Sequence, residues 1–247
     1  MTAVERVWAA QGDANQAMGC LFERLGGGVA DLPGVRLMAS GLDQPGRNGG
    51  DVHDPAAVDV ERVRAWFAAR RVPWGLRVPA GARWQHGTWL HSQRCMALEA
   101  DALQPAARSA RVDLRLAVRD DLETVAEIDA RAFAGDTADS KAWMAPRLGA
   151  AGFRVAMGSL GGIPVGTATA VATDDWGGPA VGLYGVAVVQ EARRRGIGAT
   201  LSAWLLEQAF ADGAAFAHLN ADTEDAARVY RRLGFVETPG WEIYGDI

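Results

Sequence analysis

Cysteine and lysine are scarce in this chain of 247 residues. It holds two cysteines, Cys20 and Cys95, and a single lysine, Lys141. Two cysteines are too few for a disulfide framework and are typical of a reducing compartment, so the sequence predicts a cytoplasmic location. Nearly all of the basic charge is therefore arginine, which we attribute, with the high alanine content, to genome composition.

Long apolar runs and internal repeats are also missing. No run of about 18 or more uncharged apolar residues occurs, so no transmembrane helix is expected. The first residues lack a basic stretch followed by an apolar one, so no signal peptide is expected. No period of roughly 20–50 residues repeats, which argues against solenoids and propellers. With 49% hydrophobic and 22% charged residues, the chain is expected to bury a core without help from disulfides or metals.

Positive charge is in the minority, and the acidic excess is uneven. The formal net charge is −5, with +1 on residues 1–110 and −6 on residues 111–247. Binding to nucleic acid needs clustered lysine and arginine facing phosphates, so no nucleic-acid partner is expected.

Hydrophobic periodicity predicts helices and short strands in the first part of the chain. The expected elements are helices at 4–25 and 60–67 and strands at 35–39, 74–78 and 96–98. Residues 41–55 are dense in glycine, proline, aspartate and asparagine and are predicted to form a loop. Residues 103–111 have the composition of a linker.

The second part has a clearer pattern. The expected strands are 112–118, 153–157, 163–172, 181–189, 217–219 and 241–244, and the expected helices are 120–133, 196–209 and 224–233. Gly161 and Gly162 indicate a hairpin turn, Asp120 and Glu123 have the spacing of a helix N-cap pair, and Gly234 ends the last helix. This order predicts an α/β (α+β layered) fold, in which helices flank a mixed central sheet.

The segment from Val186 to Ala199, VAVVQEARRRGIGA, joins a buried strand to a helix. Unpaired N–H groups and the helix dipole attract anions at a helix N-terminus, and glycine lets a phosphate approach closely. Three arginines add positive charge, so the segment is predicted to cradle a pyrophosphate. It is neither a P-loop, lacking Gly-Lys-Ser/Thr, nor a Rossmann motif, because Leu201 replaces the third glycine. The alternative is a solvated turn at a helix cap.

This segment resembles the cofactor signature of the GNAT superfamily of acyl-CoA-dependent N-acetyltransferases, Arg/Gln-x-x-Gly-x-Gly/Ala. A second signature, Ala-x-x-x-Tyr-x-x-x-Gly-Phe, matches from Ala226 to Phe235. The resemblance implies a catalytic GNAT domain at 111–247, and tandem members of the superfamily suggest a shorter, degenerate GNAT-like domain at 1–110. Three features depart from the usual pattern. Gln190 replaces a proline, Thr223 replaces an asparagine, and strand 181–189 carries no acidic residue.

The resemblance also implies roles for individual residues. The predicted cofactor-binding residues are Val186, Ala187, Val188, Arg193, Arg194, Arg195, Gly196, Ile197, Gly198, Ala199 and Asn220. Tyr230 would protonate the departing thiolate, although a packed aromatic is the alternative. The base that deprotonates the amine is open among Asp174, Asp175, Glu127 and water.

The implied activity is transfer of an acetyl group from acetyl-CoA to the primary amine of a small molecule by direct attack, without a metal. His86, His91 and Cys95 do not have a usual zinc spacing. The acidic second part favours a cationic acceptor. The protein is expected to be a monomer or homodimer without a membrane partner. The alternative is a non-catalytic acyl-CoA-binding or regulatory module.

Overall fold

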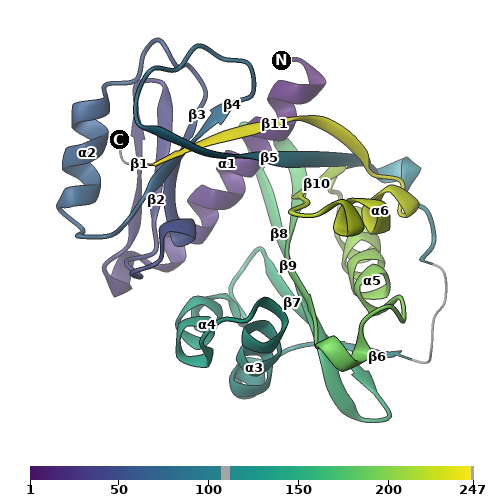
Figure 1. Ribbon diagram of the computed structural model, residues 1–247. Coiled ribbons are helices and arrows are strands. Elements are labelled where there is room, and N and C mark those ends of the chain that lie inside the picture. Colours follow the sequence, from purple (N-terminus) through teal and green to yellow (C-terminus); the bar gives the residue numbers. More distant parts are fainter. Residues whose placement is uncertain (107–111, 246–247) are drawn as a thin grey trace.

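The computed structural model describes residues 1–106 and 112–245, which build one mixed sheet flanked by helices (Figure 1). The strands are β1 (Gly28–Leu32), β2 (Val35–Ala39), β3 (Asn48–Val52), β4 (Gly75–Pro79), β5 (Thr88–Glu99), β6 (Val112–Leu116), β7 (Phe153–Leu160), β8 (Ile163–Asp175), β9 (Gly178–Val188), β10 (Phe216–Asn220) and β11 (Val236–Gly245). The helices are α1 (Ala3–Leu21), α2 (Val60–Ala68), α3 (Leu122–Phe133), α4 (Thr137–Met144), α5 (Ile197–Ala211) and α6 (Glu224–Arg232). The predicted fold class is confirmed.

The sheet joins both parts of the chain. Its strand order is β1-β2-β3-β4-β11-β5-β10-β9-β8-β7-β6. Neighbours run antiparallel except for two parallel pairs, β3 with β4 and β9 with β10, each connected by one helix. At the centre, β11 from the end of the chain lies between β4 and β5, and β5 pairs with β10. The predicted division at residue 110 stays a prediction, and strands from its two sides alternate here.

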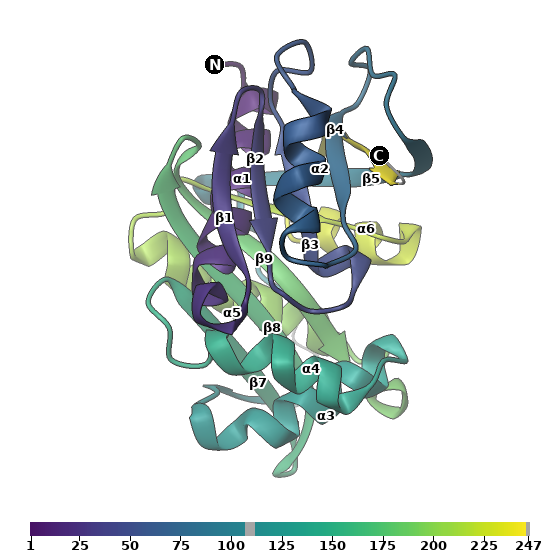
Figure 2. The same cartoon turned by 90° about the vertical axis from the view of Figure 1, so that its left-hand side faces the viewer.

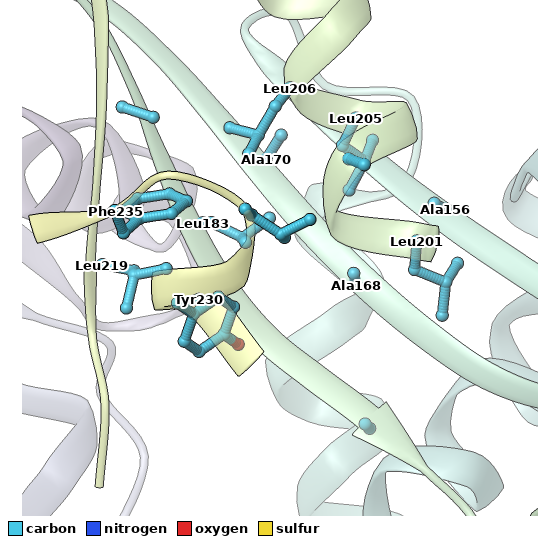
Figure 3. Packing of buried hydrophobic residues seen from close by; sticks show 14 of the residues in the cluster. Ala156, Ala168, Ala170, Leu183, Leu201, Leu205, Leu206, Leu219, Tyr230 and Phe235 are labelled. Atoms are coloured by element: carbon cyan, nitrogen blue, oxygen red, sulfur yellow. The ribbon is translucent and has the colours of Figure 1, made fainter. Parts of the chain in front are cut away.

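Each parallel crossover has its own core. On the first part, α2 lies over β1 to β4 (Figure 2), and Val63 and Phe67 pack against Leu37 and Leu76. On the second part, Leu201 and its neighbours on α5 pack on small residues of β7 and β8 (Figure 3). Fully burying such side chains contributes about 1.5–3 kcal/mol each.

Helix α1 connects the two parts by packing. Near its start, Val7 and Ala10 contact Ala180 of β9 and Phe216 of β10. Further along, Met18 belongs to a cluster with β2 and β8 residues. The helix begins with a capping box, in which the Thr2 hydroxyl accepts from the Glu5 N–H. Helix α1 thus fixes the first part against the strands that will form the site.

Most predicted elements are confirmed, including the strand at 35–39 and the hairpin of β7 and β8. The predicted loop at 41–55 is wrong, because it contains β3. A Cβ on Gly49 would lie 2.7 Å from a backbone oxygen of β4, and one on Gly50 would lie 2.7 Å from the Leu76 side chain. These glycines therefore serve close packing inside the sheet. Strand β1 and helix α4 were not predicted.

Two further predictions concern segment ends. The predicted N-cap pair of Asp120 and Glu123 is wrong: the N-cap of α3 is Asp121, which makes no side-chain cap bond, and its carboxylate accepts instead from the Val118 N–H at 2.8 Å across the preceding 3-10 turn. Of the predicted linker at 103–111, residues 107–111 lie outside the described residues. Within the described ranges, the helices are too short or too polar to cross a membrane.

Candidate active site

A cleft of about 1500 Å³ opens where the two parts meet. Every predicted cofactor-binding residue lines it except Arg195, and Tyr230 lines it as well. Residues of α1, β4 and β5 from the first part complete its walls. The site is thus built by both parts of the chain.

The cleft begins where two parallel strands separate. β9 and β10 pair over three residues, the last pair being Gly182 and His218. Beyond that point β10 pairs only with β5 among the described strands, while β9 continues to Val188. A register shift against β8 marks a bulge at Gly185, whose φ of +55° suits glycine. The edge of β9 from Val186 to Val188 that faces away from β8 therefore pairs with no other described strand and can bind an extended ligand.

Helix α5 starts at this open edge without a side-chain cap. Its N-cap is Gly196, with φ of +76°, and the first-turn N–H groups therefore remain available to a ligand. Gly198 leaves the approach open, since a Cβ there would have only ordinary contacts with Val186 and Val188. The end of the helix has the geometry of an anion site.

The three arginines before α5 differ in what they do. The Arg193 guanidinium donates to the backbone oxygens of Val188 at 3.0 Å and Ala132 at 2.6 Å, so it fastens the turn to β9 and α3. Arg194, with φ of +61°, and Arg195 are exposed. All three were predicted to add positive charge at the helix start, but the Arg193 guanidinium is held by these two carbonyls.

Tyr230 is both packed and accessible to the cleft. Its helix α6 is capped by Thr223, whose hydroxyl accepts from the Ala226 N–H at 3.1 Å. In Figure 3 the ring lies in the core cluster, with its hydroxyl turned away from Phe235. Burial, and secondarily the charge of Asp222, raises the pKa of Tyr230. The hydroxyl is therefore protonated at neutral pH and can donate a proton.

Asn220 stands at the end of β10, where its side-chain oxygen accepts from the Cys95 thiol at 3.0 Å. Burial raises the pKa of Cys95 to about 12, so the thiol stays protonated. His86 and His91 are exposed. Over the residues that the structure describes, no group of three or more ligating side chains could hold a metal ion.

None of the three acidic residues considered as bases lines the cleft. Asp174, Asp175 and Glu127 are exposed, and Asp175 lies 3.7 Å from Arg36. Asp129 of α3 does line it and was missed. It follows the buried Val125 by four residues, so a carboxylate on the apolar face of the predicted helix was the available signal.

Asp129 lies next to the bulge of β9. Asp129 is only 7% exposed, and one of its carboxylate oxygens accepts from the Ser140 hydroxyl at 2.8 Å. The other oxygen lies 4.0 Å from the position of a Cβ on Gly185. A carboxylate therefore faces the point where the free edge of β9 begins.

The first part contributes a polar wall. Asp51 accepts from Arg77 at 2.5 and 3.1 Å and from the Asn15 amide at 2.9 Å. The nearby Tyr184 hydroxyl is buried and finds no hydrogen-bond partner in the described part of the chain. Burial, together with the charge of Asp51, raises the pKa of Tyr184. Tyr184 therefore offers an unused donor at the floor of the cleft.

Comparison with known proteins identifies relatives of this architecture. The acetyltransferase (GNAT) family model matches residues 122–235. None of the curated proteins compared matches this chain. A GCN5-related N-acetyltransferase from Kribbella flavida is similar over 100% of this chain and 96% of that one, with 24% identity and a TM-score of 0.75.

Two other solved structures share the fold over most of the chain. A functionally unknown conserved protein from Staphylococcus epidermidis is 17% identical, with a TM-score of 0.63 over 88% of this chain and 93% of that one. A GCN5-related N-acetyltransferase from Sphaerobacter thermophilus is 20% identical, with a TM-score of 0.57 over 85% and 76%. These likenesses concern the fold, and they extend into the first part of the chain.

Proposed function

Because the acetyltransferase (GNAT) family model matches residues 122–235, we propose that this protein is an N-acetyltransferase. It moves an acetyl group from acetyl-CoA to the primary amine of a small molecule by direct attack. The observation that carries the proposal is that one cleft contains the uncapped start of α5, the edge of β9 that pairs with no other described strand, and Tyr230. The predicted cytoplasmic location and monomeric or homodimeric state remain predictions of the sequence.

The residues present fit acetyl-CoA. The first-turn N–H groups of α5, with Arg194 beside them, would hold the pyrophosphate. The free edge of β9 from Val186 to Val188 would pair with the amides of the pantetheine arm, and Asn220 lies across the gap. When bound, acetyl-CoA supplies the thioester carbon that an amine nitrogen attacks.

Two side chains of this protein would manage the protons. The new C–N bond forms as the C–S bond breaks, and the Tyr230 hydroxyl donates its proton to the departing sulfur. Asp129, at the β9 bulge, would hold the amine and accept its excess proton. Holding both reactants in line can contribute roughly 7–11 kcal/mol toward the barrier.

The proposal is tested by two measurements on the purified protein. Acetyl-CoA at about 100 times its Kd is expected to stabilise the fold by about 2.7 kcal/mol, seen as a rise in Tm of several degrees. A panel of amines is then screened for release of free CoA thiol. Stabilisation without thiol release would identify the alternative, a non-catalytic acyl-CoA-binding module. No stabilisation by any acyl-CoA would contradict both.

Tyr230→Phe tests the proton donor. The ring and its packing remain while the hydroxyl is lost, so kcat should fall about a hundredfold with little change in KM for acetyl-CoA. The Tm rise with acetyl-CoA should match that of the unmodified protein. Normal turnover by this variant would show that Tyr230 is only a packing residue.

A further inference from the structure

Two arginines that line the cleft stack on one tryptophan. The guanidinium carbon of Arg147 lies 3.4 Å from the ring centroid of Trp143, and that of Arg47 lies 4.0 Å from it. Each arginine ends a short 3-10 turn that contains a proline, Pro45–Arg47 in the first part and Ala145–Arg147 in the second. All three side chains line the cleft.

Among the residues that the structure describes, the charge of Arg147 has no carboxylate partner. The residue is 2% exposed, and its guanidinium donates to the Trp143 carbonyl at 2.5 Å and to the Met18 sulfur at 3.4 Å. Arg47 donates to the Gln44 side-chain oxygen at 3.2 Å. Within residues 1–106 and 112–245, neither arginine lies within 4.0 Å of a carboxylate.

Burying a cation without a nearby anion costs free energy, and this cost lowers the pKa values of both arginines. Burial, reinforced by the charge of Arg47, holds the pKa of Arg147 well below its usual range. Burial lowers the pKa of Arg47 to about 10, although Asp129 and Asp139 oppose this. Removing a charge from water costs several kcal/mol unless a well-placed counter-charge offsets it.

The buried charges around this pair do not balance. Asp129 is the buried carboxylate that acts on both arginines, whereas Asp136 and Asp139 are exposed at the rim. Two guanidinium groups therefore face one buried carboxylate, which leaves one positive charge in excess. An acceptor that reacts as a neutral amine and carries one carboxylate would supply the missing negative charge.

We propose that the acceptor is an amino acid or a similarly short amino-carboxylate, whose carboxylate is bound by Arg47 and Arg147. The inference rests on the proposed function and assigns its substrate class. The planar arginine fork matches two carboxylate oxygens, and stacking on Trp143 fixes its orientation. Asp129 lines the same cleft as both arginines and lies next to the bulge of β9, so one short molecule would place its amine near Asp129 and its carboxylate near the arginines.

This assignment differs from the cationic acceptor that net charge favours. The acidic excess of residues 111–247 includes exposed side chains such as Asp174, Asp175 and Glu127, which do not line the cleft. Net charge steers approach from a distance, whereas buried groups select what binds. The buried groups here favour an anionic end on the acceptor.

The substrate class is tested with matched acceptors. L-Amino acids are compared with their C-terminal amides and with the amines that lack the carboxyl group, at saturating acetyl-CoA, by release of free thiol. The best acid should exceed its amide in kcat/KM by about tenfold to a hundredfold, as expected for charge-assisted hydrogen bonds. Equal rates for acid and amide would overturn the proposal. So would a preference for 2-aminoethyl phosphate without any preference among carboxylates.

Variants then assign the preference to the arginine pair. In Arg147→Met, an apolar side chain of similar length replaces the buried charge, and the acid-to-amide ratio of kcat/KM should fall toward one, mainly through KM. Arg47→Gln, at a half-buried position, should do the same if the first variant folds poorly. An unchanged ratio in a folded variant would contradict the assignment.

The chain offers a matched control. Arg70 stacks on Trp66 at 3.6 Å and donates to the Trp66 carbonyl, the same four-residue spacing and contact as Arg147 with Trp143. Arg70 does not line the cleft, so Arg70→Gln should leave both the rates and the ratio unchanged.

Failure of the substrate class is distinguishable from failure of the proposed function. If no amine releases thiol, the proposed function fails, and binding is measured instead. Amino acids, and not their amides, should then raise the Tm of the protein saturated with CoA, and Arg147→Met should abolish that rise. No difference between acids and amides would overturn the carboxylate site as well.

Discussion

The molecule contains two parallel crossovers, β3–α2–β4 and β9–α5–β10, that differ at the start of the helix. In both, the strands pair over three residues before separating. α2 is capped by Asp59, whose carboxylate accepts from the N–H groups of Glu61 and Arg62 at 3.1 and 3.2 Å. α5 starts at Gly196 without a side-chain cap. The same backbone unit can therefore satisfy its own helix end or leave it for a ligand.

The two crossovers also differ in the last residue pair of their parallel strands. The last pair of β3 and β4 is Asp51 with Arg77, an ion pair that holds the two strands together. The last pair of β9 and β10 is Gly182 with His218, and glycine has no side chain with which to form such an ion pair. An ion pair holds the ends of β3 and β4 together, whereas β9 and β10 separate. This difference is why we propose one acyl-CoA site and not two.

Copying the acidic start of α2 into α5 should abolish the proposed site. In Gly198→Asp the new side chain has room and sits in the first helical turn, where an acid stabilises the helix. A phosphate about 4 Å away would be repelled by about 4 kcal/mol at an effective dielectric of about 20, roughly a thousandfold in affinity. Calorimetric titration with acetyl-CoA measures this loss.

The control is Gly198→Ala, which adds a Cβ in ordinary contact and no charge. It should retain most of the affinity, and neither variant should have a lower Tm than the unmodified protein without ligand. Tight binding of acetyl-CoA by Gly198→Asp would mean that the pyrophosphate does not bind at the start of α5.

The start of α5 could be predicted from sequence because its determinants are contiguous, from Val186 to Ala199. Strand β3 could not, because Gly49 and Gly50 have the composition of a turn and only their tight packing against β4 explains them. A short stretch of sequence indicates local structure, but it does not indicate which distant strand will pack against it.

The proposed acceptor site could not be predicted from sequence, for the same physical reason. Arg47 and Arg147 come from different parts of the chain, and nothing in either segment indicates that both stack on Trp143. The order of β4, β11, β5 and β10 also depends on pairing between the two ends of the chain. The residues of the proposed cofactor site are thus close together in sequence, whereas those of the proposed acceptor site are brought together by the fold.

His218, at the last pair of β9 and β10, is expected to make the stability of the protein depend on pH. His218 is fully buried, and burial lowers its pKa to about 4, although Asp51 opposes this. The unfolded chain takes up this proton below about pH 6.5, whereas the folded chain does so only near pH 4, so acid favours unfolding between these values. From about pH 7 to about pH 5, His218 should account for a loss of about 2 kcal/mol.

Urea unfolding of the unmodified protein and His218→Leu at both pH values isolates this contribution. The variant lacks the titrating group, so its free energy of unfolding should fall less over the same range. Carboxylates titrate alike in both proteins and cancel in the difference. Equal losses would show that His218 is already protonated in the fold at about pH 5.

The smallest effect is expected from removing the side-chain cap at the start of α2. Asp59→Ala removes the cap and should cost about 1 kcal/mol of stability, whereas Asp59→Asn keeps the hydrogen bonds and should cost little. Neither should create a second acyl-CoA site, because residues 53–59, HDPAAVD, contain no arginine or glycine. Urea unfolding and the calorimetric stoichiometry measure the two outcomes. A second equivalent of acetyl-CoA bound by Asp59→Ala would mean that the cap carboxylate alone separates the two crossovers, and that the arginines before α5 contribute little.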